Sequence, residues 1–142
     1  MTSSSCFVYG RLLDLSLLEG AAPGAVFDRI AHLPAHRLSF SESGDAALVD
    51  DEGHTVWGAV FVVPDDKLEA IGTAADGSPI GRRTAHAVDR EGERIEVVVF
   101  SGADGGRPDE ETVGHMVSGG RQWELPAGWI VGLLDLVDPF EF

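Results

Sequence analysis

FVYGRLL, at residues 7–13, places an apolar strand, a glycine and a helix-like segment directly after one another. A strand over residues 5–9 that turns at Gly10 leaves several backbone N–H groups unpaired and pointing in one direction. Such a group of donors can hold a carboxylate or a phosphate. A glycine after a strand is also typical of an ordinary tight turn, so the stretch alone supports both interpretations.

The length and the net charge of the chain limit the kinds of molecule that it can bind. The 142 residues fit one domain, residues 1–142, and 44% hydrophobic residues are enough for a sizeable core. The formal net charge is -14, from 24 acidic and 10 basic residues, which disfavours nucleic acid and anionic membranes as partners. We therefore expect a small-molecule partner, and an anionic one needs local N–H groups or arginines. The sequence leaves open whether the chain forms a homodimer.

The single cysteine, Cys6, excludes an intramolecular disulfide. One buried thiol agrees with a reducing cytoplasm. The first residues lack the basic and long apolar parts of a signal peptide, and no apolar run is long enough to cross a membrane. We expect a cytoplasmic protein.

Periodicity and turn residues predict both strands and helices. Strands are expected over residues 5–9, 36–40, 46–49, 55–63, 82–89 and 95–100, with a polar hairpin loop over 50–54. Helices are expected over residues 12–20, 26–33, 64–72, 109–120 and from 126 onward. The helix over 26–33 rests on the spacing of Val26, Phe27, Ile30 and Leu33 and is expected to end at Pro34.

Residues 55–63 give the strongest strand signal. This run is apolar on both faces, which predicts a buried central strand, and Gly58 within it predicts a bulge or the close approach of another group. With strands in the middle and helices at the end, the sequence indicates an α+β domain on a mixed or antiparallel sheet, which could close into a barrel.

Four blocks in order resemble the γ-glutamylcyclotransferase superfamily. Residues 7–12 resemble its Y-G-S-L turn, and residues 56–61 resemble its V-x-G-x-V-[FWY] strand. Residues 68–71 and the loop after them lie where the family has L-D-x-x-E-G. Residues 119–126 are similar to the late G-A-x-x-x-G-L-P segment.

The resemblance implies a small mixed β-barrel with flanking helices and a reaction that needs no metal or cofactor. In that reaction the α-amine of a γ-glutamyl group attacks its own γ-carbonyl, which releases 5-oxoproline and a free amine. The resemblance places Tyr9, Gly10, Arg11 and Leu12 around the substrate's carboxylate. One partly buried carboxylate would move the proton, with its pKa raised by desolvation.

The family's glutamate is not matched in this sequence. An ungapped count from Leu68 puts Gly72 at that position, and a count back from Gly81 puts Ala75 there. A shift of one residue brings Asp76-Gly77 to the position of the family's E-G, so Asp76 is the candidate catalytic residue. Asp-Gly is equally a plain turn dipeptide.

Other departures concern substrate binding. Arg11 stands where the family has Ser and could either pair with a carboxylate or block the usual substrate. Arg83 keeps the charge of the family's Y-x-R segment, and Phe100 stands where many members have Tyr. Trp123 precedes Pro126 in a segment that lies near the pocket in the family.

The five histidines show no metal-ligand spacing, so no metal site is expected. The predicted function is a γ-glutamylcyclotransferase-like enzyme that acts on a γ-glutamyl or related carboxylated small molecule. Because the catalytic glutamate is not matched, two alternatives stay open. One is the same fold with a different reaction in a bacterial secondary-metabolite pathway, and the other is a non-catalytic small-molecule-binding domain.

Overall fold

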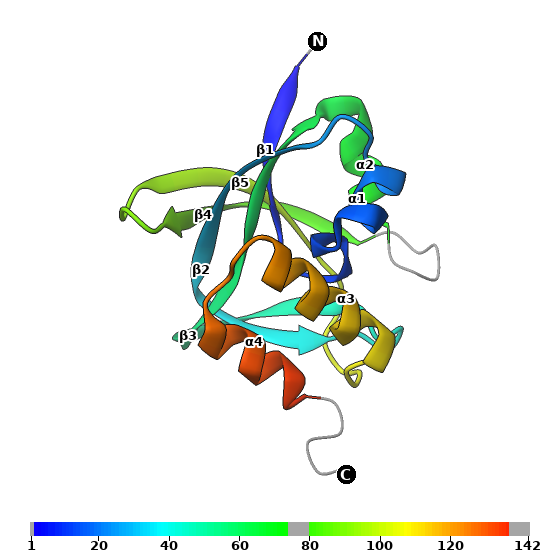
Figure 1. Ribbon diagram of the computed structural model, residues 1–142, viewed down its shortest axis with the longest axis vertical. Helices are drawn as coiled ribbons and strands as arrows, with labels where there is room; N and C mark the ends of the chain where they lie inside the picture. Colours follow the sequence, from blue (N-terminus) through cyan, green and yellow to red (C-terminus); the bar gives the residue numbers. More distant parts are fainter. Residues whose placement is uncertain (1, 74–79, 137–142) are drawn as a thin grey trace.

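The computed structural model, which describes residues 2–73 and 80–136, is a closed β-barrel with helices packed on its outside (Figure 1). The strands are β1 (Ser3–Val8), β2 (Val26–Phe40), β3 (Ala46–Pro64), β4 (Gly81–Asp89) and β5 (Arg94–Ser101). The α-helices are α1 (Leu15–Ala21), α2 (Leu68–Ile71), α3 (Glu110–Gln122) and α4 (Ala127–Leu134), and two 3₁₀-helices are η1 (Arg11–Leu13) and η2 (Asp65–Lys67). The expected α+β class and small mixed barrel are confirmed.

The strand order around the barrel is β1-β3-β2-β4-β5. All neighbouring pairs are antiparallel except β5 and β1, which close the barrel in parallel at Cys6 and Val98. As expected, residues 55–63 lie in a central strand, because β3 pairs with both β1 and β2. Gly58 marks a close approach, since a Cβ there would lie 2.4 Å from the carbonyl oxygen of Val8.

The helix expected over residues 26–33 is wrong, because this segment is the first half of β2. The register between β2 and β3 shifts between Phe27 and Arg29, so one extra residue interrupts the two-residue alternation of the strand. The bulge lets Phe27 and Ile30 lie on the same outer face although they are three residues apart, whereas Leu33 lies on the inner face, so burial on two faces imitates helical spacing. Pro34 does not end the element, because β2 continues to Phe40.

The loop expected over residues 50–54 lies inside the single strand β3. The paired stretches of β2 and β3 end at Pro34 with Thr55 and resume at His36 with Asp50. Residues 51–54 therefore oppose one residue, Ala35, which adopts a φ of 62°. The strand bends here instead of ending.

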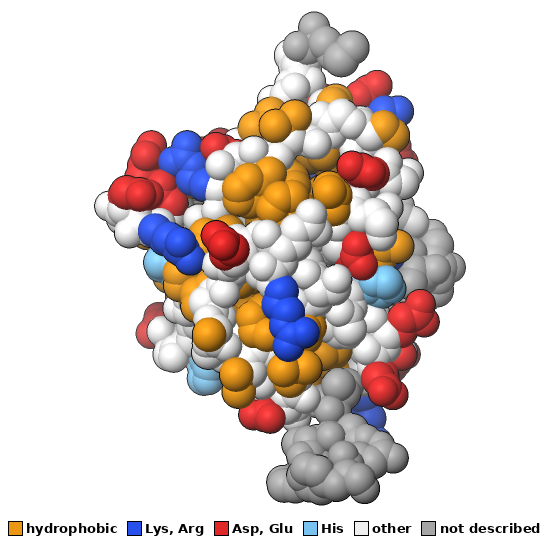
Figure 2. Space-filling view, viewed as in Figure 1, with side chains coloured by type: hydrophobic (Ala, Val, Ile, Leu, Met, Phe, Trp, Pro, Cys, Tyr) orange, Lys and Arg blue, Asp and Glu red, His pale blue; other side chains and the backbone are white. Residues whose placement is uncertain are grey.

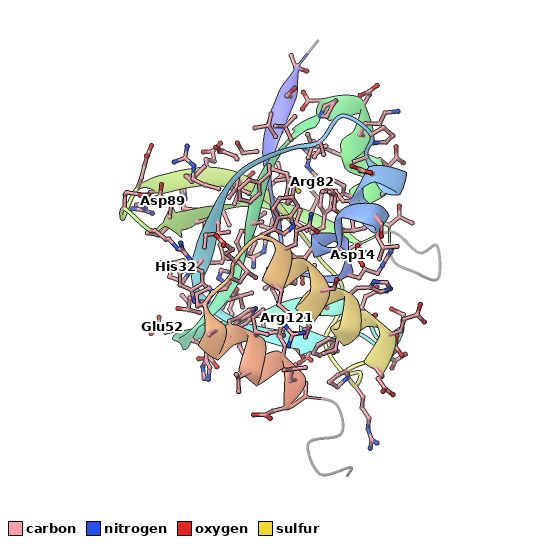
Figure 3. All side chains as sticks on the ribbon, in the orientation of Figure 1. Asp14, His32, Glu52, Arg82, Asp89 and Arg121 are labelled. Carbon is pink, nitrogen blue, oxygen red and sulfur yellow. The ribbon has the colours of Figure 1, made fainter. Side chains whose placement is uncertain are left out.

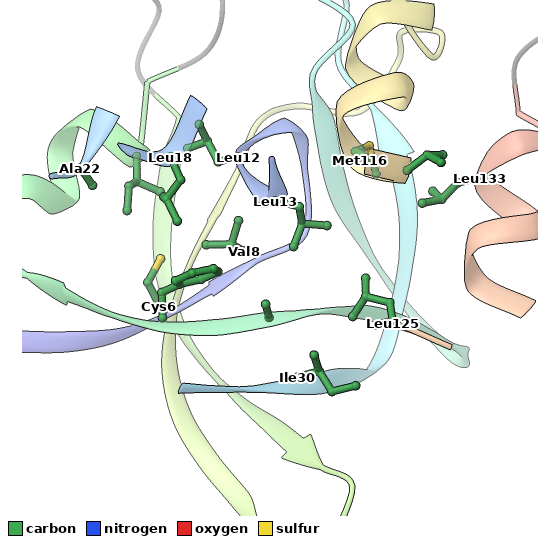
Figure 4. Packing of buried hydrophobic residues seen from close by; sticks show 14 of the residues in the cluster. Cys6, Val8, Leu12, Leu13, Leu18, Ala22, Ile30, Met116, Leu125 and Leu133 are labelled. Carbon is green, nitrogen blue, oxygen red and sulfur yellow. The ribbon is translucent and has the colours of Figure 1, made fainter. Parts of the chain in front are cut away.

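Two apolar clusters lie on the two sides of the barrel wall. The inner cluster takes residues from all five strands or their ends, including Phe7, Leu33, Val60, Ala87 and Val97. The outer cluster joins alternate residues of β1 and β3 to the helices, and Figure 4 shows its centre. Burial on both faces makes β1 a rigid support for the turn that follows it.

Helix α3 continues through Gly119 and Gly120, where the sequence predicted its end. A Cβ at Gly119 would lie 2.2 Å from the carbonyl oxygen of Leu13, and one at Gly120 would lie 2.5 Å from Ile130. The two glycines therefore let α3 pack closely on η1 and on α4. In Figure 2 apolar side chains gather in patches on the face that carries α3 and α4. Within the described residues, no helix combines the length and the apolar character needed to cross a membrane.

Candidate functional site

A cavity lies beside the turn that follows β1. Its volume is about 60 Å³, several times the roughly 10–15 Å³ that one water needs. Tyr9, Gly10, Arg11 and Leu12 line it from the turn, and Phe100 lines it from β5. The structure thus brings together five of the residues that the sequence predicted for substrate binding.

A backbone hydrogen bond within the turn and two buried side chains fix its position. The N–H of Leu13 donates to the carbonyl oxygen of Gly10 at 3.0 Å, which forms the 3₁₀-helix η1. The side chains of Leu12 and Leu13 are buried and fix the turn on the outer apolar cluster. In a helix the first N–H groups have no partner within the helix, so those at the start of η1 are candidate donors to a ligand.

Arg11 forms an ion pair with Asp45 at the cavity wall. Its Nε lies 3.3 Å from Asp45 Oδ1, and its Nη2 lies 3.5 Å from the carbonyl oxygen of Thr73. The two side chains are 26% and 10% exposed. Ser43 Oγ also donates to Asp45 Oδ2 at 2.9 Å, so the carboxylate is fixed in the turn between β2 and β3.

The sequence does not single out Asp45 as a candidate site residue. It follows Ser43 and Gly44 in a polar segment, and such a segment predicts only a turn. Its burial arises because the long strands β2 and β3 bring this turn to the end of β1, where it meets Arg11. Nothing local in the sequence shows that contact.

Tyr9 and Phe100 form an apolar wall with one satisfied polar group. The Tyr9 hydroxyl donates to the carbonyl oxygen of Phe100 at 2.7 Å, and the Tyr9 ring stacks on Phe7. Burial raises the pKa of Tyr9 above its usual value, so the phenol stays protonated at neutral pH. Tyr9 therefore shapes the cavity and is a poor proton acceptor.

The Phe100 ring occupies the space that a side chain at position 72 would need. A Cβ at position 72 would lie 2.6 Å from the Phe100 ring, which is too close for any side chain unless the ring moves. Gly72 is also where the ungapped count puts the family's glutamate. Position 72 of this chain therefore supplies no carboxylate and has no room for one with Phe100 in place.

Asp76, the candidate catalytic residue, lies outside the described residues. The residues on either side of the gap, Thr73 and Ile80, both line the cavity. The N–H of Ile80 donates to the carbonyl oxygen of Gly72 at 2.8 Å. The described residues nearest to Asp76 on either side are therefore held together at the cavity.

Arg83 is not among the described residues that line the cavity. Its Nη2 lies 2.6 Å from His36 Nε2 and 3.7 Å from Asp50 Oδ1. His36 Nδ1 lies 2.8 Å from the carbonyl oxygen of Pro34, which can only accept. Nδ1 thus carries the hydrogen and Nε2 accepts from Arg83, so Arg83 is engaged at the bend of β2.

Trp123 likewise is not among the described cavity residues. Its Nε1 donates to the carbonyl oxygen of Leu13 at 2.8 Å, and its ring stacks on Phe27 at 4.6 Å between centroids. The side chain therefore contacts the far end of η1 and packs between α3 and the barrel. Trp123 supports the turn, while its predicted contact with substrate has no counterpart in this arrangement.

The fold and the site define a small α+β barrel protein whose cavity lies at the turn after its first strand. A family model described as "Gamma-glutamyl cyclotransferase, AIG2-like" matches residues 6–124, and the chain belongs to this family. A comparison with curated proteins found no match. Among the residues described here, no three His, Cys, Asp or Glu side chains are grouped so that they could hold a metal ion.

Solved structures share the fold at low sequence identity. A structure titled "Gamma-glutamyl cyclotransferase" is 19% identical with a TM-score of 0.86, over 95% of this chain and 88% of its own. An uncharacterized Homo sapiens protein is 19% identical with a TM-score of 0.85, over 96% and 89%. YkqA from Bacillus subtilis is 14% identical with a TM-score of 0.71, over 94% of this chain and 54% of its own.

Proposed function

We propose that this protein is a γ-glutamylcyclotransferase-like enzyme that acts on a γ-glutamyl or related carboxylated small molecule and releases 5-oxoproline and a free amine. The observation that carries the proposal is the placement of Arg11 and the start of η1 at one cavity, in a chain that belongs to this family. A guanidinium next to backbone N–H donors suits a carboxylate.

In the proposed reaction, the substrate's α-carboxylate binds at Arg11 and the start of η1. The α-amine then attacks the γ-carbonyl, the C–N bond to the leaving amine breaks, and protons pass from the attacking nitrogen to the leaving nitrogen. Asp76 is the proposed carrier of these protons. Its support is the one-residue shift that brings Asp76-Gly77 to the position of the family's E-G, together with Thr73 and Ile80, the nearest described residues on either side, which line the cavity.

The test is to incubate the protein with a panel of γ-glutamyl amides and to measure 5-oxoproline. Asp76→Asn should lower turnover by roughly 100-fold or more, the usual effect of losing a general acid–base group. The matched control is Asp66→Asn, an exposed acid in η2, which should leave turnover unchanged. Unchanged turnover in Asp76→Asn would remove Asp76 from the mechanism, and a lack of 5-oxoproline from every amide would contradict the activity.

The pairing of Gly72 with Phe100 favours a second candidate function. The Phe100 ring fills the space beside position 72, so no carboxylate can stand at the ungapped position of the family's glutamate. The cavity could then bind the same class of ligand without cyclising it. It could also serve another reaction. For this candidate we expect a γ-glutamyl amide to bind and to be recovered unchanged. Release of 5-oxoproline at a rate that depends on Asp76 would contradict it.

A further inference from the structure

We propose that the Arg11–Asp45 pair recognises the zwitterionic head group of an α-amino acid, with the carboxylate at Arg11 and the ammonium at Asp45. The inference rests on the proposed function, because it concerns the ligand of the same cavity. It goes further in requiring a free α-amine for binding itself, and it assigns that requirement to Asp45.

The charges of the cavity carry this inference. Among the described residues that line the cavity, Arg11 and Asp45 are the charged ones, and their Nε and Oδ1 atoms are 3.3 Å apart. Both side chains are mostly buried, so water screens them less than it screens surface charges. A ligand group in this cavity therefore meets a positive and a negative charge side by side.

The head group of an α-amino acid carries its two charges on the same carbon atom. A site for it needs opposite charges that are adjacent, as Arg11 and Asp45 are. A lone arginine would accept any carboxylate or phosphate, whereas a carboxylate next to it disfavours a second negative charge and favours an ammonium. The pair thus selects the zwitterion over a simple acid.

The protein holds both partners in place before a ligand binds. Asp45 receives the Ser43 hydroxyl at 2.9 Å, and its carbonyl oxygen accepts the N–H of Ser41 at 2.9 Å. Arg11 begins η1, whose fixed position depends on the buried Leu12 and Leu13. Groups held in this way lose little freedom on binding.

The test compares two ligands by isothermal titration calorimetry. γ-L-Glutamylethylamide carries the zwitterionic head group, and glutaric acid monoethylamide carries the same carboxylate without the ammonium. The wild-type protein should bind the first roughly 10- to 100-fold more tightly, the usual range for one hydrogen bond to a charged group. Equal binding of both ligands, or binding of neither at millimolar concentration, would overturn the inference.

Variants assign the effect to residues. Asp45→Asn should reduce the preference for γ-L-glutamylethylamide to about threefold or less. Arg11→Gln should weaken the binding of both ligands by about tenfold or more. The control Asp66→Asn should keep the wild-type preference. A preference that survives in Asp45→Asn would overturn the role of Asp45. If this variant does not fold, amide chemical shifts of Asp45 and Ala46 in the wild-type protein give the same test. These chemical shifts should change more when γ-L-glutamylethylamide binds than when glutaric acid monoethylamide binds. Equal changes with the two ligands would overturn the role of Asp45.

The same samples separate this inference from the proposed reaction. A preference for the zwitterion without 5-oxoproline supports the inference and contradicts the reaction. Formation of 5-oxoproline together with equal binding of the two ligands supports the reaction and overturns the inference.

Discussion

Two Arg–Asp pairs lie in different parts of the barrel and have different surroundings. Arg29 and Asp89 meet at the β4–β5 hairpin, whose end carries Asp89 in Figure 3, with Arg29 Nη1 2.9 Å from Asp89 Oδ2. Arg11 and Asp45 meet at the cavity, with a longer contact of 3.3 Å. The comparison separates a pair that builds the fold from a pair that faces space for a ligand.

The carboxylate of Asp89 accepts hydrogen bonds within its own hairpin and from Arg29. It is 4% exposed, and its Oδ1 accepts the N–H groups of Glu91 at 3.0 Å and Glu93 at 2.8 Å. Burial by itself would raise the pKa of Asp89, but the N–H of Glu93 and the Arg29 guanidinium outweigh it, so the net pKa is lowered. Asp45 also has hydrogen-bond partners, Arg11 and Ser43, but it differs in lining a cavity.

The largest expected effect on stability is that of Asp89→Asn. The amide cannot replace the charge that Arg29 and the two N–H groups face, so we expect the melting temperature at neutral pH to fall by roughly 5–10 °C. Because folding lowers the pKa of Asp89, its contribution is present above the unfolded value of about 3.9 and is lost as pH falls through the folded value.

Melting curves from about pH 7 to about pH 2 test both parts of this expectation. The variant should show a smaller acid-dependent loss than the wild-type protein. A melting temperature within about one degree of wild type at neutral pH would contradict the structural role of the pair.

The next effect contrasts the two arginines. Arg11→Gln should weaken binding of γ-L-glutamylethylamide by about tenfold or more and lower the melting temperature less than Arg29→Gln does, because Asp45 keeps its hydrogen bond from Ser43 Oγ and lines the cavity. Arg29→Gln should lower the melting temperature and leave binding unchanged, because Arg29 contacts Asp89, Asp28 and Glu93. Calorimetric titration and melting curves on both variants measure this, and the reverse pattern would reject the distinction.

A smaller effect concerns how tightly the cavity wall is filled. Gly72→Ala places a methyl group 2.6 Å from the Phe100 ring, so we expect a loss of about 1–3 kcal/mol in the free energy of unfolding. Phe100→Leu in the same chain should recover part of that loss, which a double-mutant cycle in urea would show. Gly132→Ala in α4, where a Cβ meets nothing within 4 Å, is the matched control. Additive effects at positions 72 and 100 would mean that the ring does not occupy this space.

The smallest effect belongs to a third carboxylate contact, between Asp14, the N-cap of α1, and α3. His115 Nδ1 lies 2.8 Å from Asp14 Oδ2, and this hydrogen bond lowers the pKa of Asp14. Both side chains are partly exposed, so His115→Gln should cost about 0.5 kcal/mol and no more than about 1 kcal/mol. Because folding lowers the pKa of Asp14, the loss should shrink as pH falls from the unfolded value of about 3.9 through the lower folded value. Urea denaturation with His86→Gln as the control checks it, and a loss as large as that of Asp89→Asn would overturn this ranking.

Sequence alone predicted the parts of the fold that have regular patterns. Residues 55–63 are apolar on both faces and form the second half of β3, and Pro64 precedes the short helices η2 and α2 as expected. The first half of β2 was predicted as a helix because its bulge after Phe27 hides the two-residue alternation. A bulge depends on pairing with a distant strand, so a local pattern cannot show it.

The site was predictable where it follows from one continuous stretch. Tyr9, Gly10, Arg11 and Leu12 reach the cavity because they form a single turn at the end of β1. Asp45 was missed because its contact with Arg11 joins segments 34 residues apart. Trp123 was expected at the pocket from its place in the chain, yet the tight packing of α3 directs it to Leu13 and Phe27.

The most direct test of the central claim is a crystal structure of the Asp76→Asn protein with γ-L-glutamylethylamide bound. We predict that the α-carboxylate of this compound lies within hydrogen-bond distance of Arg11 and of the N–H groups at the start of η1. Occupancy of any other place on the protein, or a carboxylate turned away from Arg11, would contradict it.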